Sequence, residues 1–123
     1  LAAFIDMAAL SQTQRDAVRA SWPGPNTWIV PAAADAPRWV TGSHDGIAVR
    51  VSAHPGVRAL CLAFSGAVVS TSANRAGEPA PRSARELGPG ILAGVDALLE
   101  GETGGLDRPS VIRDARSGLA LRP

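Results

Sequence analysis

The sequence predicts an α/β fold with a twisted, mixed sheet and flanking helices. In residues 46–52 (GIAVRVS), apolar and polar side chains alternate, which indicates a strand with one buried face. Residues 55–64 then place apolar side chains at helical spacing, and the apolar run 67–70 (AVVS) predicts a short buried strand. A strand, a helix and a second strand in this order predict a crossover unit in a partly parallel sheet.

The elements before this unit are indicated by capping and turn residues. Ser11 and Gln14 form a capping-box pattern, which predicts a helix over about residues 12–21 that ends at WPGP. Residues 27–32 (TWIVPA) are rich in β-branched and aromatic residues and predict a strand. The polar stretch 33–46 predicts a loop.

In the second half, Ser83 and Glu86 predict another capped, short helix that Gly88 and Pro89 end. Residues 95–101 (VDALLEG) fit either a strand or a helical turn. PSVIRDA and LALRP on either side of RSG predict a terminal hairpin. With no repeat or linker in the chain, we expect one domain over residues 1–123.

Composition excludes several classes of protein. The 12 basic residues are all arginines and nearly balance 11 acids, so no global field favours nucleic acid or an anionic membrane. A single cysteine rules out an intramolecular disulfide, so we expect a reducing, cytoplasmic setting. No apolar run reaches the roughly 18 to 20 residues of a membrane span. The chain starts at Leu1 without an initiator methionine, and we expect it to continue a preceding segment.

Neutral polar residues gather behind the predicted strand 67–70, in the order Ser70, Thr71, Ser72 and Asn74. Hydroxyl and amide groups at the carboxyl end of a strand can hold phosphate or carboxylate oxygens. The alternative is a turn that satisfies its own backbone.

Arg50 lies on the polar side of its predicted strand, where it can bind an anion in bidentate fashion or form a surface salt bridge. The same alternatives apply to Arg113 and Arg122 of the predicted hairpin. Thr27 follows WPGP, which either fixes its hydroxyl at the mouth of a strand or is a simple turn. Cys61 belongs to the apolar stripe of its helix and is expected in the core.

No metal site is predicted, because the two histidines lack ligand spacing, and neither a Walker loop nor a GxGxxG motif is present. Four blocks nevertheless occur in order: SWPGPNTWIVPA, IAVRVSAHP, VVSTSANRAGEPAPRSA and RPSVIRDA. Together they closely resemble the YrdC-like family, the L-threonylcarbamoyladenylate synthases. The resemblance implies a nucleotidyltransferase that converts ATP, L-threonine and bicarbonate to threonylcarbamoyl-AMP and pyrophosphate. It also implies partner proteins that transfer the threonylcarbamoyl group to tRNA, with Mg²⁺ a candidate companion of ATP.

The same resemblance implies roles for matching residues. Arg50 would bind the threonine carboxylate, with Ser70 and Ser110 also on the threonine side. Nucleotide-binding residues would be Ser72, Asn74 and Arg122, and Thr27 would lie near the pocket wall.

The sequence departs from the family pattern at its start. The family's PT(E/D)T-like turn and Lys-x-Arg motif are not in these 123 residues, and there is no lysine at all. We therefore expect weak or no synthase activity from this chain alone. Two alternatives stay open: a non-catalytic nucleotide- or RNA-binding module, and the YrdC-like domain of hydrogenase-maturation carbamoyltransferases.

Overall fold

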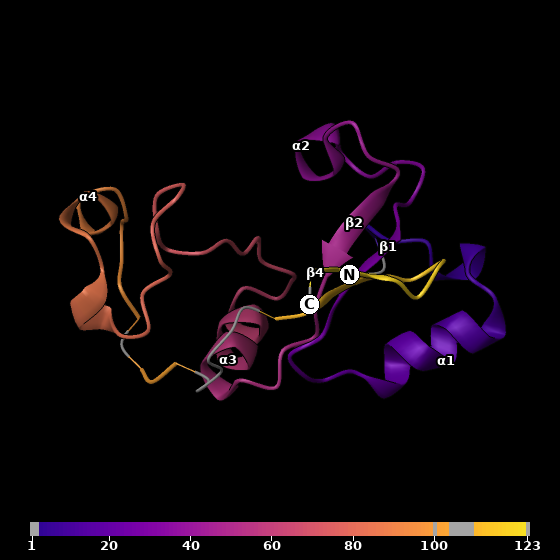
Figure 1. The fold of residues 1–123 in the computed structure, drawn as a ribbon, viewed down its shortest axis with the longest axis horizontal. Helices are drawn as coiled ribbons and strands as arrows, with labels where there is room; N and C mark the ends of the chain where they lie inside the picture. The colour runs from indigo at the N-terminus through magenta and orange to yellow at the C-terminus, as the bar shows by residue number, and fades with distance from the viewer. Residues whose placement is uncertain (1–2, 100, 104–109, 123) are drawn as a thin grey trace. The chain divides into compact units, whose positions relative to one another are not determined.

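The computed structural model describes residues 3–99, 101–103 and 110–122. Contacts between residues divide the chain into two compact units. Figure 1 shows the chain coloured by residue number. Unit 1 comprises Leu1–Ala67 and Arg108–Pro123, and unit 2 comprises Val68–Asp107. The expectation of one domain over residues 1–123 stays a prediction.

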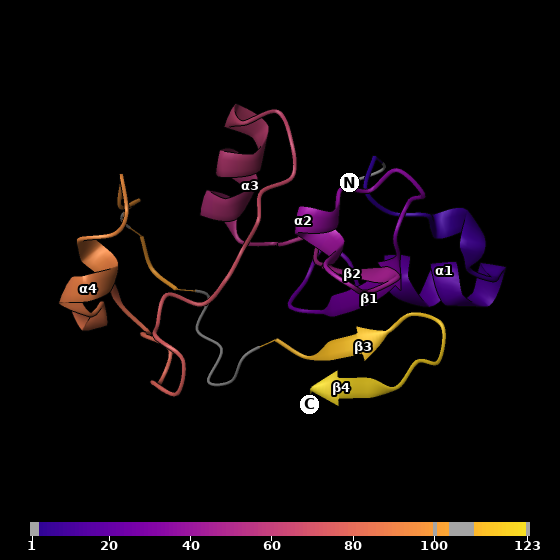
Figure 2. The same ribbon diagram turned by 90° about the horizontal axis from the view of Figure 1, so that it is seen from above.

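Unit 1 is built on a mixed sheet of four strands in the order β2-β1-β3-β4. The strands are β1 (Thr27–Pro31), β2 (Gly46–Val49), β3 (Ile112–Asp114) and β4 (Ala120–Arg122). Strand β1 pairs antiparallel with β2 and parallel with β3, and β3 and β4 form an antiparallel hairpin (Figure 2). The predicted mixed sheet, the strand at 27–32 and the terminal hairpin are confirmed.

The core lies on one side of this sheet. The strand residues Trp28, Val30, Ile47 and Val49 are buried, so the predicted alternation in β2 is confirmed. The other members of the apolar core cluster come from the amino-terminal segment, the first α-helix and the hairpin turn: Ile5, Leu10, Val18 and Ala115. A cluster of this size is held together mainly by the removal of apolar surface from water.

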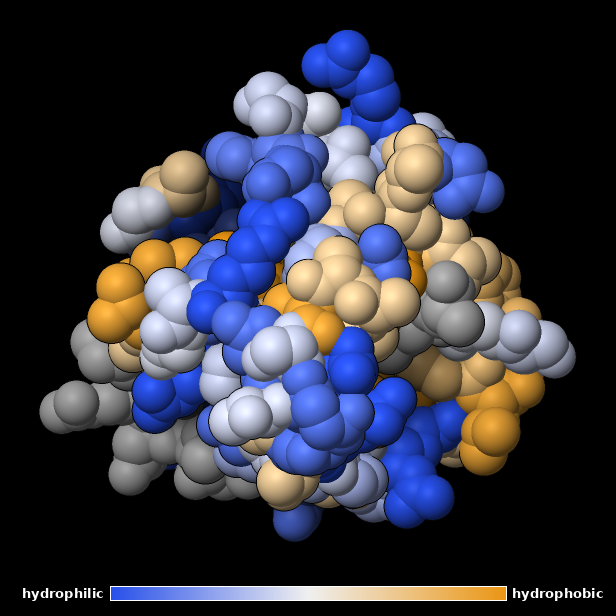
Figure 3. All heavy atoms as spheres, turned by 90° about the vertical axis from the view of Figure 1, so that its right-hand side faces the viewer, coloured by the Kyte–Doolittle hydropathy of each residue, from blue (hydrophilic) through white to orange (hydrophobic). Residues whose placement is uncertain are grey.

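Helix α1 (Gln12–Ala20) begins where the capping box predicts. The Ser11 hydroxyl accepts from the Gln14 N–H at 3.3 Å, and the Gln14 side chain accepts from the Ser11 N–H at 2.8 Å. Only Val18 of this helix is buried, and the other side faces water. Figure 3 shows unit 1 from the side that carries α1, where hydrophilic side chains cross the face and apolar ones form separate groups.

Two local predictions in unit 1 need correction. The expected loop at 33–46 contains one turn of helix, α2 (Arg38–Thr41), which starts after Pro37 in extended conformation. Helix α3 (Pro55–Ala63) forms as predicted with Pro55 in its first turn, but none of its residues is buried. Leu60 and Phe64 are 49% and 67% exposed, and Cys61 is half-buried rather than in the core. Helical spacing predicts which side chains share a face but not whether another element covers that face.

The predicted buried strand at 67–70 is wrong. These residues have no strand pairing in the described chain, and Val69 is 82% exposed. A strand needs the backbone of a neighbour for its hydrogen bonds, and a short apolar run cannot supply one. The parallel pairing of the sheet is made instead by β1 and β3.

Unit 2 contains two short helical turns, η2 (Ala84–Glu86) and α4 (Pro89–Leu92). The Ser83 hydroxyl donates to the Glu86 carboxylate at 3.0 Å and does not cap the backbone, so the second capping box is not formed and the turn is a 3-10 helix. Gly88 and Pro89 separate the two turns, and Pro89 begins α4. Residues 95–99 are neither strand nor helix.

The turn of the β3–β4 hairpin is organised by Asp114. Its carboxylate accepts from the N–H groups of Ser117 and Arg116 at 2.7 and 2.9 Å and from the Ser117 hydroxyl at 3.0 Å. Gly118 closes the turn with φ +74°, a conformation that glycine adopts without strain. The Ser117 N–H is the main reason that the pKa of Asp114 lies below its ordinary value.

We expect Val30→Ala to lower the free energy of unfolding by about 2 kcal/mol, because Val30 is fully buried and its truncation leaves a cavity. Urea unfolding followed by circular dichroism measures this. The matched control is Val69→Ala, which removes the same atoms from an exposed side chain and should change stability by less than about 0.5 kcal/mol. Equal losses in the two variants would contradict the assigned core.

We expect Asp114→Asn to remove a pH-dependent part of the stability. A carboxyl whose pKa is lowered by folding stabilises the fold above its unfolded pKa and loses this contribution as the pH falls through the folded pKa. The stability difference between wild type and variant should therefore be greatest near neutral pH and shrink as the pH falls below 3.8. Urea unfolding of both proteins over this range tests it, and a difference independent of pH would refute it.

Candidate functional site at one end of the sheet

Four of the predicted site residues, Thr27, Arg50, Ser110 and Arg122, belong to unit 1. Thr27 is the first residue of β1, and Arg50 directly follows the last residue of β2. Trp28 pairs with Val49 in the antiparallel ladder, so continuing this register by one residue sets Thr27 across from Arg50. Both then lie on the face of the sheet away from the buried Trp28 and Val49.

The other two residues reach the same end of the sheet through β3 and β4. Thr27 is in register with Ile112 of the parallel strand β3, which Ser110 precedes by two residues. Ile112 in turn pairs with Arg122 of β4. The topology therefore brings all four unit 1 residues to one end of four neighbouring strands.

Arg50 is exposed, as its predicted place on the polar side of the strand requires. The described part of the chain supplies no hydrogen-bond or ion-pair partner for its guanidinium group. The surface salt bridge that was the alternative for Arg50 is thus not formed among these residues. Its planar donors are available to an anion.

Thr27 and Ser110 are joined by their side chains. The two hydroxyl oxygens lie 3.2 Å apart, and either group can be the donor. The Thr27 N–H also donates to the carbonyl of Val111 at 3.0 Å. Sequence reasoning placed both residues near the pocket but missed this pairing, because 83 residues separate them in the chain.

Arg122 contacts the same segment from β4. Its guanidinium Nη2 donates to the Ser110 carbonyl at 3.0 Å. Arg113 pairs with Ala120, whereas Arg122 pairs with Ile112, and the register shifts between these two positions. One donor of Arg122 therefore supports Ser110, and its other N–H groups have no hydrogen-bond partner among the described residues.

The WPGPN turn fixes the start of β1. The Trp22 indole donates to the Asn26 carbonyl at 2.9 Å, and the Gly24 N–H donates to the Val51 carbonyl at 2.8 Å. A Cβ at Gly24 would lie 2.8 Å from the Ser21 carbonyl oxygen, so the turn has no space for a side chain there. The Trp22–Pro23 peptide bond is cis. Thr27 is thus held by a closely packed turn on one side and by the sheet on the other.

The remaining predicted residues, Ser70, Ser72 and Asn74, belong to unit 2. Ser70 and Ser72 are exposed, and the described residues offer no partner for their hydroxyls. They do not follow a strand, so the expected placement at a strand's carboxyl end is wrong. The predicted roles of these three residues beside unit 1 residues therefore stay predictions.

Asn74 closes a turn of its own loop. Its amide nitrogen donates to the carbonyls of Arg75 and Glu78, each at 2.9 Å, and the Glu78 N–H donates to the Arg75 carbonyl at 3.0 Å. Its side-chain oxygen is buried and has no partner in the described structure. Asn74 therefore forms the turn that satisfies its own backbone, which was the alternative interpretation of this segment. Its side-chain oxygen remains able to accept a hydrogen bond from another donor.

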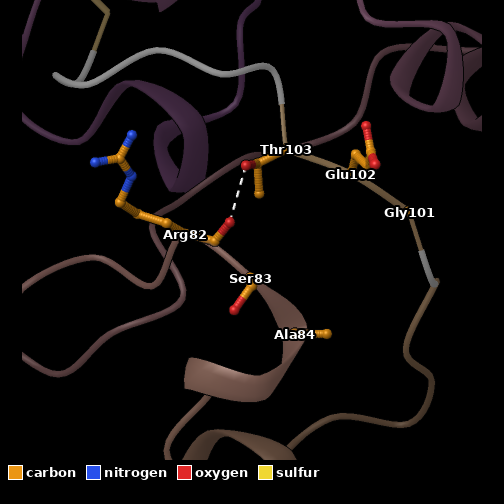
Figure 4. A pocket seen from close by; sticks show the side chains of 6 residues that line it. All are labelled: Arg82, Ser83, Ala84, Gly101, Glu102 and Thr103. Carbon is orange, nitrogen blue, oxygen red and sulfur yellow. Dashed lines mark hydrogen bonds between the residues drawn. The ribbon is translucent and has the colours of Figure 1, made fainter.

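An open hollow of about 350 Å³ lies within unit 2 (Figure 4). It is lined by Arg82, Ser83, Ala84, Gly101, Glu102 and Thr103. The Thr103 hydroxyl donates to the Arg82 carbonyl at 2.9 Å across it. None of the predicted site residues lines this hollow, and its side chains are exposed.

Among the described residues, no group of three or more histidine, cysteine or acidic side chains is placed to hold a metal ion. None of the helices within these ranges combines the length and the apolar character needed to cross a bilayer.

Comparison with known proteins shows which family this chain resembles. Residues 1–123 match the family of Sua5, YciO and YrdC proteins, described as "Telomere recombination". The chain belongs to the Sua5/YciO/YrdC family. Over 119 residues, 97% of its length, it is 60% identical to the threonylcarbamoyl-AMP synthase of Xanthomonas campestris pv. campestris strain B100. It is 58% identical over the same length to the protein of that name from Xanthomonas oryzae pv. oryzae strain PXO99A. The chain spans 64% of the length of these relatives.

Solved structures of the family have the same fold. A variant of P. abyssi Sua5 superimposes with a TM-score of 0.86 at 25% identity, covering 98% of this chain and 37% of that one. P. abyssi Sua5 complexed with L-threonine gives a TM-score of 0.79 at 25% identity, covering 91% and 32%. The YrdC-like fold predicted from the sequence is thereby confirmed.

We expect Asn74→Ala to loosen the loop at 74–78, because two backbone carbonyls lose their side-chain donor. Amide hydrogen exchange at Glu78 should speed up about threefold to tenfold, as for the loss of one or two ordinary hydrogen bonds. Ser72→Ala is the control and should leave this exchange unchanged. Unaltered exchange in Asn74→Ala would mean that the amide does not hold the turn.

Proposed function

We propose that the protein to which this chain belongs is a threonylcarbamoyl-AMP synthase that acts in the threonylcarbamoyladenosine modification of tRNA. The observation that carries this proposal is the 60% identity to a threonylcarbamoyl-AMP synthase over 97% of the chain. The end of the unit 1 sheet supports it chemically, because two arginines and two hydroxyl groups gather there.

L-threonine is the proposed amino-acid substrate, and P. abyssi Sua5 has been solved with it. In this proposal the Arg50 guanidinium binds the threonine carboxylate, since it is exposed and has no partner among the described residues. Ser110 contributes a hydroxyl group to the threonine, and Thr27 lies at the wall of its site. The role of Ser70, which belongs to unit 2, stays a prediction from the sequence. A fixed charge for the carboxylate and neutral donors for the rest suit a zwitterionic ligand with a hydroxyl side chain.

The proposed nucleotide is ATP, a substrate for which Mg²⁺ is a candidate companion supplied with the nucleotide rather than held by the protein. Arg122 of unit 1 is proposed to contact the nucleotide, and the nucleotide-binding roles of Ser72 and Asn74 in unit 2 stay predictions from the sequence. Asn74 has a buried oxygen without a partner, which can accept from a base or ribose donor. Arg122 already binds the Ser110 carbonyl and has further N–H groups for phosphate oxygens.

The proposed reaction has two steps. The neutral amine of threonine adds to carbon dioxide, supplied by bicarbonate, and loses a proton to give a carbamate. A carbamate oxygen then bonds to the α-phosphorus of ATP while the bond from that phosphorus to the bridging oxygen breaks and pyrophosphate leaves. The protein contributes mainly by holding two anions together and compensating the developing charge.

The product is a reactive mixed anhydride, so a second protein must use it. We propose that tRNA threonylcarbamoyl-transfer proteins in the cytoplasm consume it. These partners follow from the proposed reaction.

The function is tested by pyrophosphate release that requires ATP, L-threonine and bicarbonate together. The full-length Xanthomonas campestris relative is the reference enzyme. We expect the 123-residue chain to release pyrophosphate much more slowly than this reference, because these residues contain no lysine and lack the Lys-x-Arg motif expected at the triphosphate. Pyrophosphate release that does not depend on threonine would contradict the proposal, and RNA binding without turnover would favour a binding module.

We expect Arg50→Ala to weaken L-threonine binding by about tenfold to a hundredfold, the usual effect of losing a charge-assisted hydrogen bond. NMR-detected titration of the chain measures the dissociation constant. Arg58→Ala removes another exposed arginine, from helix α3, and should leave binding unchanged. Equal weakening in both variants would show a general charge effect and would refute the specific role of Arg50.

A further inference from the structure

We infer that Thr27 is a positioning residue that fixes the Ser110 hydroxyl for the amino-acid substrate. This inference rests on the proposed function, because it concerns the same threonine site. It assigns to Thr27 a role that acts through another side chain and needs no contact with the substrate.

Two bonds connect Thr27 to the Ser110 segment. The Thr27 and Ser110 hydroxyl oxygens are 3.2 Å apart, and the Thr27 N–H donates to the Val111 carbonyl at 3.0 Å. The first bond sets the side chain of Ser110, and the second sets the backbone that follows it. Because Arg122 donates to the Ser110 carbonyl, Ser110 is held from β1 on one side and from β4 on the other.

Thr27 is well suited to act as the fixed member of the pair. It is half-buried, β-branched and located in the central strand of the sheet, between β2 and β3. Branching at Cβ restricts its rotamer, so its hydroxyl has few alternative directions. The WPGPN turn immediately before it is closed by the bond from Gly24 to Val51.

The bond to Thr27 restricts the Ser110 hydroxyl, whose small side chain would otherwise rotate freely. A serine hydroxyl has one hydrogen and two lone pairs. When one of these is engaged by Thr27, the directions left for a ligand are defined before the ligand arrives. Preorganisation of this kind improves binding by reducing the entropy lost on association.

The test is a set of variants of the 123-residue chain titrated with L-threonine and followed by ¹H–¹⁵N NMR. Thr27→Val keeps the shape and the backbone bond but removes the hydroxyl, whereas Thr27→Ser keeps the hydroxyl. Ser110→Ala and the double variant complete a thermodynamic cycle. Thr13→Val on the exposed side of α1 is the matched control. Dispersed spectra verify folding, and Thr27→Ala replaces Thr27→Val if the latter is unfolded.

We expect Thr27→Val to raise the dissociation constant for L-threonine about threefold to tenfold, the loss of one neutral hydrogen bond. Thr27→Ser should return it to within about twofold of wild type. The double variant should bind no more weakly than Ser110→Ala, because Thr27 acts through Ser110.

Three results would overturn the inference while leaving the proposed function intact: wild-type affinity in Thr27→Val, failure of Thr27→Ser to restore binding, or additive losses in the double variant. Additive losses would show that Thr27 acts independently of Ser110. If the wild-type chain gives no shift with L-threonine, the proposed threonine site and this inference both fail.

Discussion

Strand β1 is hydrogen-bonded along both edges, to β2 on one side and to β3 on the other. It also alternates between the core, through Trp28 and Val30, and the opposite face, through Thr27. This single strand therefore connects the burial of apolar surface to the placement of polar groups. A side chain at the end of β1 can be held in place because the rest of the strand is fixed by packing and by two ladders.

The polar groups at this end come from four places in the chain that only the sheet brings together. Arg50 arrives by antiparallel pairing, Ser110 by parallel pairing and Arg122 by the hairpin. Parallel pairing of β1 with β3 joins residues that are more than 80 positions apart, as the bond between Thr27 and Ser110 shows. Side chains from separate strands are in this way brought to one end of the sheet by backbone pairing.

Local features of the fold were predictable because they depend on neighbouring residues. The capping box at Ser11 and Gln14, the alternation in 46–49 and the hairpin around Gly118 all follow from short-range chemistry and are present. The predicted strand at 67–70 is absent, since strand formation depends on a partner that the local sequence does not contain. For the same reason, helical spacing located α3 correctly but did not predict that Leu60 and Phe64 remain exposed, because burial requires another element packed against them. In the candidate site, the exposed position of Arg50 was predictable from the alternation, whereas the pairing of Thr27 with Ser110 depended on tertiary register.

The β3–β4 hairpin is attached to the rest of unit 1 at its turn as well as along β1. Arg116 donates to the Asp45 carboxylate at 2.8 Å, and its carbonyl accepts from the Gln14 side chain at 2.6 Å. The turn is thus tied to the loop before β2 and to helix α1, while Ser110 and Arg122 lie at the opposite, open end of the hairpin. A displacement of this turn would be passed along β3 to that end, because β3 connects the turn to the Ser110 segment. Surface residues such as Arg116 can in this way alter the spacing of side chains at the far end of the sheet.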